Sequence, residues 1–118
     1  MNRSVYLVME PIQVIATDLA MHVQEYDPSA TVLIALSPEA ACEVLRTVAS
    51  VRFAFVHVAA HKFGGTDLAL ALHVRGARIV FSGASPDRNN SEKLVLDWPF
   101  SAETTANLLG QAERMNAA

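Results

Sequence analysis

Residues 31–45, TVLIALSPEAACEVL, place a strand directly before a helix. Residues 31–36 form an uncharged, partly β-branched run, which is typical of a strand buried in a sheet. Ser37 is a favoured N-cap residue, Pro38 suits the first helical position, and Glu39 suits the positive end of the helix dipole. This stretch therefore predicts a strand that leads within one residue into a capped helix.

The same alternation of strand and helix extends along the whole chain. The other apolar runs that predict strands are Val5–Met9, Phe53–Val58, Arg78–Ser82 and Lys93–Asp97. The segments with helical spacing start at Pro11, span Thr66–Arg75 before Gly76, and follow Ser101. Alternating strands and helices indicate a parallel sheet covered on both faces and joined by right-handed crossovers. We therefore predict one α/β domain over residues 1–118, a three-layer α/β/α sandwich.

Composition excludes several functional classes. The chain has 118 residues and a net charge of −3, which argues against a nucleic-acid partner bound by a basic surface. A single cysteine, Cys42, rules out an internal disulfide and favours the reducing cytoplasm. The apolar run Val5–Met9 is too short for a signal peptide, and no stretch reaches the roughly 18 apolar residues of a membrane span. We expect a cytoplasmic domain without a membrane partner.

In an open parallel sheet, ligands bind beyond the carboxyl ends of the strands. The residues that follow the predicted strands are Met9–Glu10, Ser37, residues 57–61, Ser82–Gly83 and residues 97–99. No glycine-rich phosphate loop and no G-x-S-x-G nucleophile elbow occurs in the sequence. A small enzyme or ligand-binding domain that uses Glu10, His57 and Ser82 at this edge remains one hypothesis.

Three segments, in this order, resemble the receiver domain of bacterial two-component response regulators. Residues 55–69, FVHVAAHKFGGTDLA, are similar to the third strand, its loop and the start of the third helix. Ile79–Gly83 resembles the fourth strand with its terminal hydroxyl residue, and residues 98–101, WPFS, resemble a lysine–proline–phenylalanine turn. The resemblance runs from Val5 to about Met115. It implies a flavodoxin-like five-stranded parallel sheet of order 2-1-3-4-5, with no output domain.

The family's phosphorylation chemistry is largely missing from the matching positions. In the family, acids after the first strand and an aspartate ending the third strand hold Mg²⁺, and that aspartate accepts phosphate. A serine or threonine ending the fourth strand and a lysine before the proline contact the phosphoryl group. The matching positions here are Met9, Glu10, His57, Ser82, Trp98 and Pro99. The resemblance thus implies a degenerate pseudo-receiver, without catalysis, a cofactor or a Mg²⁺ site.

The resemblance also implies a partner surface. Receiver-like domains use the fourth helix, fifth strand and fifth helix to contact partners, which corresponds here to about residues 86–112. The residues of this candidate surface are Trp98, Phe100, Ala106 and Leu109. The expected partner is another signalling protein, either a kinase or a downstream regulator, and a second copy of the chain is a further candidate. Trp98 could instead close the vacated phosphate pocket.

Several roles are possible for His57. It could accept phosphate as a phosphohistidine, bind a metal ion or respond to pH. The simpler interpretation is that it fills the vacated acidic pocket beside Glu10 or Ser82. If His57 contacts Glu10, an ion pair would replace the Mg²⁺-bound arrangement and hold one conformation without phosphate. His61, four residues further on, is predicted to lie in a loop, where this spacing does not place the two rings together.

Overall fold

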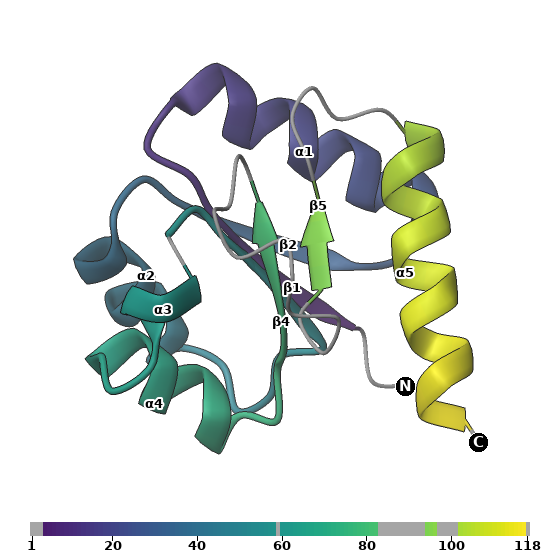
Figure 1. Ribbon diagram of the computed structural model, residues 1–118. Coiled ribbons are helices and arrows are strands. Elements are labelled where there is room, and N and C mark those ends of the chain that lie inside the picture. The colour runs from purple at the N-terminus through teal and green to yellow at the C-terminus, as the bar shows by residue number, and fades with distance from the viewer. Residues whose placement is uncertain (1–3, 59, 83–93, 97–101, 118) are drawn as a thin grey trace.

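The computed structural model describes residues 4–58, 60–82, 94–96 and 102–117 (Figure 1). The strands are β1 (Val5–Met9), β2 (Thr31–Ala35), β3 (Phe53–Val56), β4 (Arg78–Ser82) and β5 (Leu94–Leu96). The helices are α1 (Gln13–Tyr26), α2 (Pro38–Leu45), α3 (Ala60–Phe63), α4 (Asp67–Val74) and α5 (Ala102–Ala117).

The five described strands form one parallel sheet in the order β2-β1-β3-β4-β5. Helices α1 and α5 cover one face, and α2, α3 and α4 cover the other (Figure 1). The prediction of a three-layer, flavodoxin-like α/β/α sandwich with this strand order is confirmed.

The side chains of each strand alternate between two hydrophobic cores. Val8 and Phe55 belong to the core under α1 and α5, whereas the next residues along, Met9 and Val56, belong to the core under α2 and α4. This alternation follows from the period of two along a strand. It means that residues in register on neighbouring parallel strands face the same layer of helices.

The predicted Ser37 cap is confirmed: its hydroxyl accepts a hydrogen bond from the Ala40 N–H at 3.1 Å. Thr66, predicted as the first residue of a helix, is instead the N-cap of α4, and its hydroxyl accepts a hydrogen bond from the Ala69 N–H at 3.1 Å. Gly76 follows α4 with a φ of +73°, a left-handed conformation that glycine adopts without a Cβ clash.

Other predicted boundaries are wrong. Helix α1 begins at Gln13 with Ile12 as its N-cap, so Pro11 precedes the helix instead of lying in its first turn. The third strand ends at Val56 instead of Val58, and the short helix α3 follows where a loop was predicted. The apolar Val58 suggests a longer strand, but the regular pairing of β3 ends at Val56.

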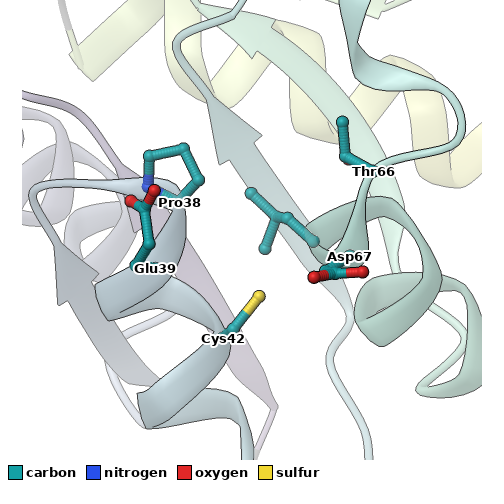
Figure 2. A pocket seen from close by; sticks show the side chains of 6 residues that line it. Pro38, Glu39, Cys42, Thr66 and Asp67 are labelled. Atoms are coloured by element: carbon teal, nitrogen blue, oxygen red, sulfur yellow. The ribbon is translucent and has the colours of Figure 1, made fainter.

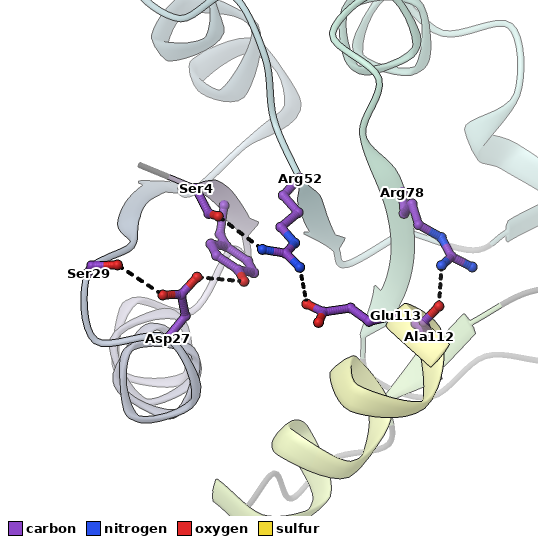
Figure 3. Close-up of polar contacts among 8 residues, drawn as sticks. Ser4, Asp27, Ser29, Arg52, Arg78, Ala112 and Glu113 are labelled. Atoms are coloured by element: carbon purple, nitrogen blue, oxygen red, sulfur yellow. Dashed lines mark hydrogen bonds and ion pairs between the residues drawn. The ribbon is translucent and has the colours of Figure 1, made fainter. Parts of the chain in front are cut away.

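A polar network joins the elements at the amino ends of the strands (Figure 3). The buried Tyr6 hydroxyl donates to Asp27 Oδ2 at 3.2 Å, and Arg52 lies 2.6 Å from Glu113 of α5 while donating to Ser4 Oγ at 3.1 Å. Burial, together with the Asp27 carboxylate, raises the pKa of Tyr6 well above its usual value. These contacts fix the edge opposite to the one where the candidate site lies.

No helix in the described ranges is both long enough and apolar enough to cross a bilayer.

Candidate functional site

Register brings three of the predicted site residues to the carboxyl edge of the sheet. Met9 of β1 pairs with Val56 of β3, and Val56 pairs with Phe81 of β4. The next residue on each strand path is Glu10, His57 or Ser82, so these three occupy neighbouring positions at this edge. The backbone N–H of His57 donates to Met9 O at 3.0 Å and extends the ladder by one residue.

Glu10 and His57 form the one close contact of charged groups at this edge among the described residues. His57 Nδ1 lies 3.2 Å from Glu10 Oε1. The Glu10 side chain is 3% exposed, while that of His57 is 45% exposed. The interpretation of His57 as a residue that fills the acidic pocket beside Glu10 is therefore consistent with its position.

Glu10 has a second role that sequence reasoning missed. Its Oε2 accepts a hydrogen bond from the N–H of Ile12, at 3.4 Å, and Ile12 is the N-cap of α1. The first turn of α1 contains no acid, and Ile12 has no side chain that could cap it. The carboxylate therefore lies at the positive end of the helix dipole, which stabilises its negative charge. An acid three residues before a helix is the signal that could have shown this.

Ser82 ends β4 and is 5% exposed. Its hydroxyl makes no hydrogen bond with any residue in the described ranges. Thr105 of α5 is fully buried, and its hydroxyl likewise finds no partner among the described residues; the sequence analysis did not single it out. Buried hydroxyls without partners are uncommon in folded proteins, because each loses its hydrogen bonds to water.

The other predicted site residues do not join this group. Met9 is 1% exposed and packs into the core under α2 and α4, so it does not fill the edge beside Glu10. Leu109 is fully buried in the opposite core, and it is therefore unavailable as part of a partner surface; its place on α5 faces α1 and the sheet. Ala106 is half-buried. Trp98, Pro99 and Phe100 lie outside the described residues.

A metal site is not built into the described part of the chain. No group of three or more histidine, cysteine, aspartate or glutamate side chains there is placed to hold a metal ion. His61 lies in α3, whereas His57 follows β3, so the two histidines do not share a helix. Their four-residue spacing therefore has no helical geometry behind it.

A cavity of about 470 Å³ lies between the first turns of α2 and α4, and neither Glu10 nor His57 lines it (Figure 2). Its lining residues are Pro38, Glu39, Cys42, Thr66, Asp67 and Leu68. Cys42 is half-buried. Burial first, and then the carboxylates of Asp67 and Glu39, raise the pKa of the Cys42 thiol. The thiol is therefore held in its protonated, weakly nucleophilic form.

Solved structures share this fold over nearly the whole chain. The BeF3-activated conformation of SdrG from Pseudomonas melonis Fr1 superposes with a TM-score of 0.68 and 20% identity, over 95% of this chain and 98% of that one. The signal receiver domain of an HD domain-containing protein from Pseudomonas fluorescens Pf-5 superposes with a TM-score of 0.66 and 17% identity, over 99% of this chain and 100% of that one.

A third match is a chain that fuses the yeast Spc42 trimeric coiled coil to another protein, with a TM-score of 0.72 and 20% identity, over 99% of this chain and 82% of that one. Neither a protein-family profile nor a curated protein sequence matches this chain. At these identities the likeness establishes the fold, and the chain has a receiver-like fold.

Proposed function

We propose that this protein is a degenerate receiver that takes part in signal transduction through protein–protein contacts and does not form an aspartyl phosphate. The observation that carries the proposal is the contact between buried Glu10 and His57 at the carboxyl edge. The likeness to SdrG and to a signal receiver domain supports the broader role in signalling.

The electrostatics of the edge support a mechanism without a divalent cation. A phosphoryl group beside carboxylates needs a divalent cation and an ammonium group to balance its charge. Here Glu10 is the one carboxylate among the three edge positions, and an imidazole stands where the phosphoacceptor would be. When His57 is protonated, the pair balances the buried charge of Glu10 without a metal ion. One conformation of the edge is then held in the absence of phosphate.

The partner in this proposal is another signalling protein, a kinase or a downstream regulator, or a second copy of the chain. Its contact surface includes Trp98, Phe100 and the exposed side of α5, and it excludes Leu109, which is buried. A location in the cytoplasm belongs to the same proposal and rests on the single cysteine.

Beryllofluoride with Mg²⁺ tests the proposal, because it mimics a phosphoryl group on an aspartate. We expect the backbone amide NMR signals of Glu10, His57 and Ser82 to stay unchanged during the titration. The variant His57→Asp restores a second carboxylate beside Glu10 and serves as the positive control. A saturable response of the unmodified protein that EDTA abolishes would contradict the proposal.

A second candidate is a small enzyme or ligand-binding domain of the same fold. One observation favours it, namely an exposed imidazole beside a buried acid. The cavity described between α2 and α4 is lined by neither Glu10 nor His57, so it lends this candidate no support. Small-molecule binding that Glu10→Gln, His57→Gln and Ser82→Ala all weaken, while partner binding persists, would favour this second candidate.

A further inference from the structure

The ring nitrogen of His57 that does not contact Glu10 is Nε2. Nδ1 lies 3.2 Å from a carboxylate oxygen, which offers only lone pairs. In the neutral ring the proton therefore resides on Nδ1, where it avoids repulsion between two lone pairs, and Nε2 carries the free lone pair. The side chain is 45% exposed, so a reagent can approach it.

Ser82 supplies a hydrogen-bond donor at the neighbouring position. The register of Val56 with Phe81 places Ser82 beside His57 across the β3–β4 ladder. The alternation along the strands assigns Glu10, His57 and Ser82 to the same face of the sheet, because Val8, Phe55 and Val80 two residues earlier share one core. The Ser82 hydroxyl is buried and has no partner among the described residues. An anionic oxygen bound near His57 would give this hydroxyl an acceptor.

We propose that His57 Nε2 accepts a phosphoryl group from a donor with a P–N or acyl P–O bond, without a divalent cation, and that the Ser82 hydroxyl donates to a phosphoryl oxygen. The inference rests on the proposed function, because it supplies a covalent input to the same edge of the signalling domain. Glu10 acts as a positioning residue: it contacts the ring at Nδ1, on the side away from the incoming phosphorus.

The transfer balances with phosphoramidate as the donor. The Nε2 lone pair forms the new N–P bond while the P–N bond of the donor breaks, and the electron pair leaves with ammonia. The ring becomes cationic and retains its Nδ1 proton beside the Glu10 carboxylate, which offsets the new positive charge. With acetyl phosphate the P–O bond breaks instead, and acetate leaves with the electron pair.

The test incubates the whole protein with phosphoramidate, and in a second arm with acetyl phosphate, in each case once with EDTA and once with Mg²⁺. Labelled residues are located by mass spectrometry at alkaline pH, where phosphohistidine survives. We expect His57 to be labelled about tenfold faster than exposed His73 of α4, because only His57 has a positioned ring and a neighbouring donor. A response to one donor alone identifies which bond type the site uses.

Variants separate a positioned nucleophile from an imidazole that is merely exposed. His57→Gln abolishes this label, Glu10→Gln and Ser82→Ala slow it several-fold, and His73→Gln leaves it unchanged. Equal rates at His57 and His73, or a rate that Ser82→Ala does not alter, would overturn the inference. If His57 is not labelled and beryllofluoride causes no response, this inference alone is overturned. If labelling requires Mg²⁺, the proposed function is contradicted as well.

Discussion

The Glu10 carboxylate is almost fully buried, whereas the His57 ring in contact with it is close to half exposed, at 3% and 45% of their side-chain surfaces. The contact therefore contributes more to stabilising Glu10 than His57. Glu10 has lost its water and depends on His57 and on the N–H of Ile12, while His57 can turn to solvent. Removing His57 is thus the more damaging change.

We expect His57→Ala to lower the free energy of unfolding by about 1–3 kcal/mol, because it leaves a buried carboxylate with one long hydrogen bond. Adding Glu10→Gln to that variant should restore part of the loss, since the unpaired charge is gone. Urea unfolding followed by circular dichroism measures both effects. His73→Ala, at an exposed position on α4, is the control. A loss no larger than that of the control would show that Glu10 does not depend on His57.

The raised pKa of Tyr6 predicts that the folded protein loses stability at alkaline pH. Burial and Asp27 raise its pKa in the folded protein above the unfolded value of about 10. The corresponding stability is fully present below pH ~10 and is lost as pH rises towards the folded pKa. Tyr6→Phe should cost about 1 kcal/mol at neutral pH, from the lost hydrogen bond to Asp27, and flatten this decline. The free energy of unfolding, measured from pH 8 to 11 for both proteins, tests this prediction. An unchanged decline of stability in Tyr6→Phe would show that Tyr6 does not cause it.

The contact between Arg52 and Glu113 links the start of β3 to α5. The two groups lie 2.6 Å apart and are 45% and 31% exposed, so we expect a coupling of about 0.5–1 kcal/mol that weakens at high salt. A double-mutant cycle with Arg52→Ala and Glu113→Ala measures it. The more exposed pair Arg46–Glu43, at 3.6 Å, is the matched control and should couple less. Equal coupling in the two pairs would show that the network does not anchor α5.

The cavity between α2 and α4 predicts slow alkylation of Cys42. Its raised pKa, caused first by burial and then by Asp67 and Glu39, keeps the thiolate fraction small at pH 7. Asp67→Asn removes one opposing charge and should speed the reaction with iodoacetamide about two- to threefold. Glu43→Gln, which changes an acid of α2 that does not line the cavity, should leave the rate unchanged. Equal alkylation rates in all three proteins would show that Asp67 does not contribute to the raised pKa of Cys42.

The fold was predictable because its signals are local. Ser37 with Pro38, and Gly76, have backbone preferences that act within a few residues, and the structure confirms the helix ends predicted from them. Where the local signal was ambiguous, the prediction was wrong. Pro11 suits both a first helical turn and the residue before an N-cap, and the structure places it before the N-cap Ile12.

The candidate site was predictable in its residues but not in its contacts. The resemblance to receivers brought Glu10, His57 and Ser82 to one edge, and the register agrees. Burial could not be predicted to the same degree, since it depends on packing between layers: Leu109 points into the core, and Thr105 has a buried hydroxyl without a described partner.

The claim that an imidazole replaces the divalent cation at this edge is tested most directly by paramagnetic relaxation with Mn²⁺, a substitute for Mg²⁺. The account predicts no saturable broadening of the amide signals of Glu10, His57 and Ser82 in the unmodified protein, and clear broadening in His57→Asp. Saturable broadening centred on these three residues in the unmodified protein, reversed by excess Mg²⁺, would contradict it.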